Sequence, residues 1–364
     1  MMKKWKKRML AGSFGALVLL LVIGSVIVAC RKQQRIRFVA EMGNGINLGN
    51  SLDSTNLRMY DPERGELEYE TFWGNPTITE IPFQAIKEAG FGCVRIPVTW
   101  DEHIAGDGTI SGVWMERVAE VVEMALAQDL YVILNTHHEV WLNLEAEKEE
   151  QIYAQYKNIW TQIAQRFQQY DEKLLFEGMN EPRLRESEHE WDGGTPKLRE
   201  MVNILNQIFV ETVRETGGEN KERYLLICPY CHQTEHEAMQ ELAIPKGNVI
   251  VAVHMYEPYT FCQEDGGAAL WTAERESGEK SIEEAFLDLE QIYIRRGIPV
   301  MITEFGCKDK NNLQDRVTWT EFYCNRAKEL GISCIWWDNG SDYQLLDRTN
   351  GQWKYPELME TLTK

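Results

Sequence analysis

The stretch LLFEGMNEP, residues 174–182, reads as a buried strand that ends in polar residues. Three apolar residues open it, and Asn180, Glu181 and Pro182 close it. Near-continuous apolar runs separated by helical segments are typical of a parallel sheet that is buried on both faces. We therefore expect Glu181 to lie at the carboxyl end of a parallel strand.

Seven further runs after residue 40 have the same character and alternate with helical periods. Strands are predicted over 45–50, 93–97, 130–139, 174–182, 224–229, 248–256, 298–306 and 332–340, and helices over 79–90, 113–128, 149–170, 196–215, 236–242, 281–296 and 315–330. Eight such units predict an α/β fold, a (β/α)₈ TIM barrel over residues 41–364. The long loop 257–280 is expected to form one wall of a cleft.

The composition is that of a soluble domain that is not built for nucleic acid. The chain has 364 residues, 43% of them hydrophobic, and a formal net charge of -19. A strongly acidic surface repels nucleic acid but not a neutral polymer. The eight cysteines are scattered, some in apolar strand-like runs, which indicates free thiols rather than a disulfide framework.

The first 29 residues differ from the rest. A basic start and a long apolar run indicate a signal peptide or a membrane anchor. The run ends in IVAC, and a small residue before Cys30 resembles a bacterial lipobox, which implies cleavage there and lipidation of Cys30. The alternative is an uncleaved anchor helix. Either would hold the domain outside the cell on the lipid membrane, with residues 30–40 as a short tether.

Polar and aromatic residues gather where the predicted strands end. In a (β/α)₈ barrel all these ends open on one face, where the active sites of this fold lie. The residues are Asn47, Asn50, Arg95, His137, His138, Asn180, Glu181, His254, Tyr256, Glu304 and Trp336 to Asp338.

Two acids at this face suggest a chemistry. Glu181 and Glu304 follow the fourth and seventh strands and would face each other across the barrel mouth. Each alone could be a structural partner of an arginine. Together they match the carboxylate pair of glycoside hydrolysis, in which one acid gives a proton and the other is ionised.

The motifs around these residues resemble the retaining β-glycanases of glycoside hydrolase family 5 (clan A). The resemblance rests on GINLGNSLD, ETFWGNP, IKEAGFGCVRIPVTW, NTHHE, NEP, HMYEP, TEFG and IWWDNG, which run in the family's order from about residue 40 to the end. WGNP and VRIPVTW are most similar to the endo-β-1,4-glucanases, the cellulases.

The resemblance implies roles for individual residues. Glu181 would be the acid/base and Glu304 the nucleophile, with Arg95 and Tyr256 holding Glu304 ionised and Asn180 bonding the sugar 2-hydroxyl. The substrate-binding residues would be Asn50, Arg95, Trp100, His137, His138, Asn180, His254, Tyr256 and Trp337. Trp73, Trp100, Trp141 and Trp271 are also expected to face the sugar, and Trp337 to lie under its ring. Strand alternation would let one member of each pair, His137/His138 and Trp336/Trp337, face the mouth.

Charge and backbone chemistry add two expectations. Arg95 should lower the pKa of Glu304, and the resulting anion should raise the pKa of Glu181. Pro182 should restrain Glu181 to extended backbone geometry. The motif CPYC (228–231), followed by His232 and His236, could suggest a redox or zinc site, but it lacks the sequence context that either requires.

The sequence therefore predicts a monomeric, cell-attached, retaining endo-β-1,4-glucanase that needs no metal or cofactor. One alternative keeps the machinery but changes the polymer to xyloglucan, mixed-linkage glucan, mannan or xylan. A second is a surface glycan-binding protein without catalysis.

Overall fold

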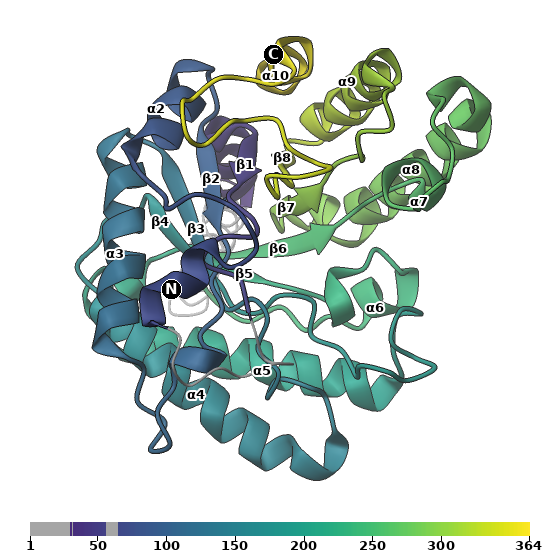
Figure 1. Ribbon diagram of the computed structural model, residues 1–364. Coiled ribbons are helices and arrows are strands. Elements are labelled where there is room, and N and C mark those ends of the chain that lie inside the picture. The colour runs from purple at the N-terminus through teal and green to yellow at the C-terminus, as the bar shows by residue number, and fades with distance from the viewer. Residues whose placement is uncertain (1–29, 31, 56–64) are drawn as a thin grey trace, which may run out of the picture.

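The computed structural model describes residue 30, residues 32–55 and residues 65–364. Within them, parallel strands close into a barrel in the order β1 to β8, and helices surround it (Figure 1). The strands are β1 (Gly45–Asn47), β2 (Cys93–Ile96), β3 (Tyr131–Asn135), β4 (Leu174–Glu177), β5 (Leu225–Ile227), β6 (Val249–His254), β7 (Val300–Phe305) and β8 (Ser333–Trp336). The predicted (β/α)₈ barrel is confirmed.

The outer layer contains longer helices and short 3₁₀ turns. The helices are α2 (Glu80–Glu88), α3 (Gly112–Ala127), α4 (Glu149–Arg166), α5 (Pro196–Glu215), α6 (His236–Gln240), α7 (Tyr259–Cys262), α8 (Trp271–Ile292), α9 (Leu313–Glu329) and α10 (Pro356–Thr363). The 3₁₀ turns are η1 (Glu66–Thr71), η2 (Asp101–His103), η3 (Ala146–Lys148), η4 (Gly218–Lys221), η5 (Tyr230–His232) and η6 (Ile294–Arg296).

The predicted long loop over 257–280 is wrong, because α7 lies within it and α8 begins at Trp271 rather than near residue 281. Asp315 Oδ1 accepts the backbone N–H of Trp271 at 2.7 Å, which satisfies an amide at the helix start. Gly278 leaves room for the Trp271 ring, since a Cβ there would lie 2.7 Å from it. These tertiary contacts stabilise the first turns of α8, and the hydrophobic periodicity of the sequence does not reveal them.

Side chains alternate along the strands between the barrel interior and the helix layer. One buried cluster fills the interior near the amino ends of the strands and contains Val39, Met42, Cys93, Ile133, Leu175, Leu226, Ile250, Ala252, Met301 and Ile335. A larger cluster joins the outer strand faces to the helices. Interior positions further along the strands are polar, so the barrel is apolar at one end and polar at the other.

Most of the segment 30–40, which was expected to be a short tether, is helical, and this helix extends from residue 32 to residue 42. Val39 and Met42 are buried in the interior cluster, and Ser333 Oγ donates to the Val39 carbonyl at 2.6 Å. Phe38 stacks on Tyr224 with ring centroids 4.0 Å apart. Apolar residues at this helical spacing cover the amino end of the barrel.

The predicted leader in residues 1–29 lies outside the described residues. In the part of the chain that is described, no helix has both the length and the apolar character required to cross a bilayer.

An irregularity in β7 matters for the opposite, carboxyl end of the barrel. Val253 pairs with Ile302 and His254 with Glu304, so β7 carries one extra residue between the two pairs. The pairing with β8 shifts over the same stretch. Such a bulge changes the direction of a side chain. Simple alternation from Met301, which is inside, would point Glu304 outward, and the bulge instead directs it into the mouth.

Candidate active site

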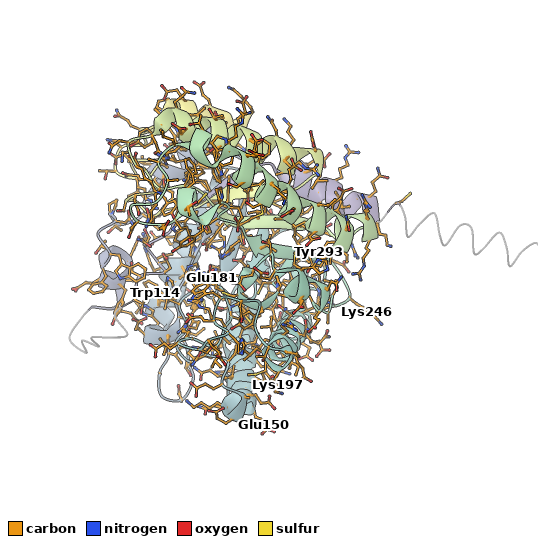
Figure 2. The ribbon with its side chains drawn as sticks, turned by 90° about the vertical axis from the view of Figure 1, so that its right-hand side faces the viewer. Trp114, Glu150, Glu181, Lys197, Lys246 and Tyr293 are labelled. Carbon is orange, nitrogen blue, oxygen red and sulfur yellow. The ribbon has the colours of Figure 1, made fainter. Side chains whose placement is uncertain are left out.

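Glu181 and Glu304 converge at the carboxyl end of the barrel. His254 at the end of β6 contacts both, with Nδ1 2.9 Å from Glu181 Oε1 and 3.6 Å from Glu304 Oε2. One carboxylate oxygen of each glutamate lies within 4.8 Å of the other. Lys246 lies in the loop before β6 and so marks the amino end of that strand. In Figure 2, which views the barrel from its side, Glu181 lies to the left of Lys246. The two acids therefore form a close pair on the face predicted to hold the site.

The Glu304 carboxylate is held by two donors. Arg95 Nη1 donates to its Oε1 at 2.7 Å, and the Tyr256 hydroxyl donates to its Oε2 at 3.0 Å. Arg95 is fully buried and also donates to Asn47 Oδ1 at 3.0 Å and to Asn180 Oδ1 at 2.9 Å. The contacts of Arg95 and Tyr256 with Glu304 were expected from the family resemblance, and the structure places all three residues together.

Glu177 is part of the site, although the sequence analysis gave it no role. Its Oε2 accepts from Arg95 Nε at 2.6 Å and from Asn135 Nδ2 at 3.1 Å. Burial opposes ionisation of Glu177, yet the Arg95 guanidinium holds its pKa well below the ordinary value. Alternation could have revealed the residue, because Leu175 faces inward and Glu177 is two positions later.

The pKa order expected for the two acids is reversed in the unliganded protein. Burial raises the pKa of Glu304 to about 8, against the opposing effect of Arg95. Burial also opposes ionisation of Glu181, but the hydrogen bond from His254 and the charge of Arg183 lower its pKa to about 2. The negative charges of Glu181 and, to a smaller extent, Glu177 also raise the pKa of Glu304 and so oppose the effect of Arg95. Between these two pKa values the pair shares one proton.

Glu181 does not have the extended backbone expected from the proline that follows it. Its φ is 44°, in the left-handed region. Its backbone N–H donates to His232 Nδ1 at 3.1 Å, and Arg183 Nη1 donates to its carbonyl at 2.8 Å and contacts its Oε2 at 3.3 Å. These tertiary contacts override the local preference.

Both histidines of NTHHE lie at the mouth, where one was expected. The His137 ring is parallel to Trp337, with centroids 5.8 Å apart, and His138 is 5.4 Å from Trp73. Strand β3 ends at Asn135, so alternation no longer governs the two residues after it.

For the tryptophan pair, alternation holds. Trp336 is fully buried, with Nε1 donating to the Tyr343 carbonyl at 3.0 Å, whereas Trp337 is half-buried beside His137. A Cβ at Gly49 would lie 2.6 Å from the Trp337 ring, so the backbone of the loop after β1 is packed directly against the ring.

Two buried side chains hold the strand ends around Trp337. Arg348 donates to the Gly49 carbonyl at 2.9 Å and to the Asp338 carbonyl at 2.7 Å. Asn75 of the WGNP motif donates to the Asn50 carbonyl at 2.8 Å and to the Asn339 carbonyl at 3.1 Å. Asn50 thus lies at the mouth as predicted, and Asn75 of WGNP connects the loops after β1 and β8 by hydrogen bonds.

The prediction that Trp100 and Trp271 face the sugar is wrong, because both are at most 1% exposed. Trp100 Nε1 donates to the Asn135 carbonyl at 3.0 Å, which turns its ring beneath the end of β3. Trp73 is 38% exposed and Trp141 is half-buried, so these two retain an accessible ring. Composition alone does not separate core from surface tryptophans.

Three groups among the described residues could each offer three ligand atoms to a cation. They are Asp53/His137/His138, Glu177/His232/His254 and Glu181/His254/Glu304. The cysteines of CPYC belong to none of them, and every cysteine with a described position is a free thiol. A close acid pair, one member held by fixed donors, is suited to proton transfer and covalent catalysis.

Comparison with known proteins gives the family. The model of the family cellulase (glycosyl hydrolase family 5) matches residues 60–343. Endoglucanase A of Clostridium longisporum is 37% identical over 349 residues, which cover 93% of this chain and 67% of that protein.

Two solved structures are similar in fold and sequence. A xyloglucan-specific endo-β-1,4-glucanase from a metagenomic library, in complex with cellotriose, is 36% identical with a TM-score of 0.86, covering 91% of this chain and 99% of that one. A broad-specificity endoglucanase from Ruminococcus champanellensis with bound cellotriose is 38% identical with a TM-score of 0.86, covering 90% and 97%.

The buried ion pair of Glu177 and Arg95 predicts a large stability effect. Glu177→Gln leaves the fully buried Arg95 guanidinium short of one anion, so we expect the free energy of unfolding at pH 7 to fall by about 3 kcal/mol. Urea titration measures it. Glu116→Gln, which removes an exposed partner of Arg166, is the matched control and should cost less than about 1 kcal/mol. Equal losses in the two variants would contradict the prediction.

Proposed function

The chain belongs to glycosyl hydrolase family 5 and is a cellulase-like endo-β-glucanase; from that premise we propose that it is a retaining endo-β-1,4-glucanase with Glu304 as nucleophile and Glu181 as acid/base. The observation that carries the proposal is the close approach of the acids, since one oxygen of each lies within 4.8 Å of the other and His254 Nδ1 contacts both. Retaining pairs are about 5–5.5 Å apart, whereas inverting pairs are about 6.5–9.5 Å apart to leave room for a water.

The contacts of each acid support these roles. Glu304 is bound through Arg95 and Tyr256, which fix both its oxygens and leave it oriented for attack. Glu181 has the more exposed side chain, at 22% against 7% for Glu304, so it can reach a leaving oxygen and later a water. A fixed nucleophile and an accessible acid are the division of labour that double displacement requires.

In the first step, a Glu304 oxygen forms a bond to the anomeric carbon while the bond from that carbon to the glycosidic oxygen breaks. Glu181 gives its proton to the departing oxygen. In the second step, a water loses a proton to Glu181 and attacks the same carbon, and the ester bond to Glu304 breaks. The product keeps the configuration of the substrate, and both glutamates return to their starting states.

The shared proton must lie on Glu181 when substrate is bound. The positive charge that develops at the anomeric carbon stabilises the Glu304 anion, and the glycosidic oxygen accepts a hydrogen bond from protonated Glu181. Substrate must therefore move the proton from the arrangement favoured in the unliganded protein to the reactive one, and the hydrogen bond from Glu181 to the glycosidic oxygen favours that transfer while the total charge of the pair stays the same.

The polymer is proposed to be a β-1,4-glucan, with Trp337 under the sugar ring and Trp73 further along the mouth. The similar solved structures include a xyloglucan-specific and a broad-specificity enzyme, each with cellotriose, so xyloglucan and mixed-linkage glucan are the main alternatives. A reducing-sugar assay over these polymers, mannan and xylan separates them. A zero rate on all of them, with glycan binding retained, would support the non-catalytic alternative.

The two acids should fail in different ways. Glu304→Ala cannot form the glycosyl-enzyme and should lose activity on every substrate, and azide should restore turnover with inverted configuration. Glu181→Ala should still release dinitrophenolate from dinitrophenyl β-cellobioside, because that leaving group needs no proton, and then stall until azide gives a retained product. NMR of the anomeric proton reports the configuration. An inverted wild-type product would contradict the role of Glu304.

The shared proton predicts the alkaline limit of activity. Because the pKa of Glu304 is raised to about 8, the pair holds its proton below that pH and loses it above, so kcat/KM on β-glucan should fall as pH rises through about 8. Tyr256→Phe removes a donor to the Glu304 anion and should move this limb to higher pH. Tyr259→Phe, at a tyrosine that is 59% exposed, should leave it in place. A limb that Tyr256→Phe does not move would argue against this contact.

We further propose that the N-terminal segment holds the enzyme on the outside of a bacterial membrane, through lipidated Cys30 or an uncleaved anchor. The basic start, the apolar run and the IVAC motif support this. Wild-type protein should partition to the membrane fraction. Under lipidation, Cys30→Ala changes the mass of the mature chain by blocking cleavage, whereas an uncleaved anchor leaves the length of the chain unchanged. Wild-type protein found entirely in the medium would contradict both forms of attachment.

A further inference from the structure

The loop after β5 is joined to the NEP segment by two hydrogen bonds. Cys231 N–H donates to the Pro182 carbonyl at 3.0 Å, and His232 Nδ1 accepts the backbone N–H of Glu181 at 3.1 Å. Cys231 and His232 have φ angles of 52° and 55°, so two consecutive residues are left-handed here. His232 is fully buried. The loop therefore takes an unfavourable backbone conformation that brings an imidazole under Glu181.

The hydrogen bond to Glu181 settles the tautomer of His232. Nδ1 accepts a hydrogen bond from an amide, so it carries no proton itself, and a neutral imidazole then has its proton on Nε2. Nε2 faces Glu177 Oε1 at 3.5 Å. Since Glu177 is ionised, an Nε2–H directed at it is the favourable arrangement. His232 thus accepts from the backbone of one acid and faces the carboxylate of another.

We infer that His232 is a positioning residue that holds Glu181 in the conformation needed for proton transfer. The inference rests on the proposed acid/base role of Glu181. A residue other than glycine keeps a positive φ only where its surroundings enforce it, and Glu181 has a φ of 44°. Its amide is bound by His232 and its Oε1 by His254, whose rings stack with centroids 4.2 Å apart.

The same imidazole links the two catalytic acids through the barrel interior. His232 faces Glu177, Glu177 accepts from Arg95, and Arg95 donates to Glu304. One continuous group of buried polar residues therefore contacts both the Glu181 backbone and the Glu304 side chain. A shift of His232 would displace Glu181 while leaving the donors of Glu304 intact.

A cation between Glu177, His232 and His254 is the competing interpretation, because their ligand atoms lie within 4.8 Å of one another. Ligation through His232 Nε2 would require that nitrogen to lose its proton while Nδ1 still accepts the Glu181 amide. The ring would then be an imidazolate anion. The hydrogen-bonded arrangement needs no such charge, and it accounts for both ring nitrogens.

Two substitutions at His232 separate its two contacts. In His232→Asn, Oδ1 occupies the position of Nδ1 and can still accept the Glu181 amide. In His232→Gln, the terminal amide occupies the region of Nε2 and can still face Glu177, but the acceptor for Glu181 is lost. His236→Asn, on α6 with a side chain 52% exposed, controls for loss of a histidine nearby. Thermal unfolding of each variant reports folding.

The readout is the leaving-group dependence of the first step. For His232→Gln we expect kcat on soluble β-1,4-glucan to fall by ~10- to 100-fold, as for other supporting contacts of reactive groups, with KM little changed. The rate of the dinitrophenolate burst from dinitrophenyl β-cellobioside should stay within about 3-fold of the wild-type rate, since this step needs no proton from Glu181. His232→Asn should restore most of the loss on glucan.

Each other outcome overturns the inference. Equal losses on both substrates, or equal losses in the Asn and Gln variants, mean that His232 only packs. Loss of activity in chelator with recovery on Zn²⁺ alone, in wild type and not in His232→Gln, means a metal site. Glu181→Ala tests the acid/base role of Glu181 separately. If this variant lacks the expected burst and stall, the proposed function fails. If it shows them and the His232 variants are unaffected, the positioning role alone is rejected.

Discussion

The mouth of this barrel depends on the guanidinium of Arg95. It is fully buried, and a buried cation is stable only where anions and acceptors surround it. Glu177, Glu304, Asn47 and Asn180 supply them from β4, β7, β1 and the segment after β4. Because all five donors of a guanidinium lie in one plane, these partners are fixed in direction as well as distance. The geometry of the acid pair follows from satisfying this one charge.

The same charge explains how the acids share a proton. A cation next to one carboxylate would normally ionise it, and the sequence analysis expected this for Glu304. Burial, together with the negative charges of Glu181 and Glu177, outweighs Arg95, so the pKa of Glu304 stays raised and the hydrogen-bond donors of Glu304 serve mainly to orient it. Arg95 therefore has two different effects: Glu177 balances its positive charge, whereas Glu304 is oriented by its hydrogen bond.

Much of the fold was predictable, because it depends on hydrophobic period and on the carboxyl ends of parallel strands. The strand ends placed Glu181, Glu304, Arg95 and Tyr256 on one face. What could not be predicted depends on tertiary contacts: the bulge that turns Glu304 inward, and the burial of Trp100 beneath β3. His232 was not predicted because its neighbours in sequence suggested thiol and metal chemistry, whereas its partners lie at the end of β4 and in the segment after it. The helix at 32–42 was missed because a basic stretch with few apolar residues was interpreted as a linker.

The helix at residues 32–42 determines which end of the barrel faces any support that is attached to the preceding residues. Residues 38, 39 and 42 seal the amino ends of the strands, and the acid pair opens at the carboxyl ends. A chain fixed by residues before 32 therefore turns its sealed end toward the support and its mouth toward the surrounding medium. A polymer of any length can then cross the mouth sideways without passing beneath the protein. If residues before 32 are attached to a support, the depth of the barrel lies between that attachment and the acid pair.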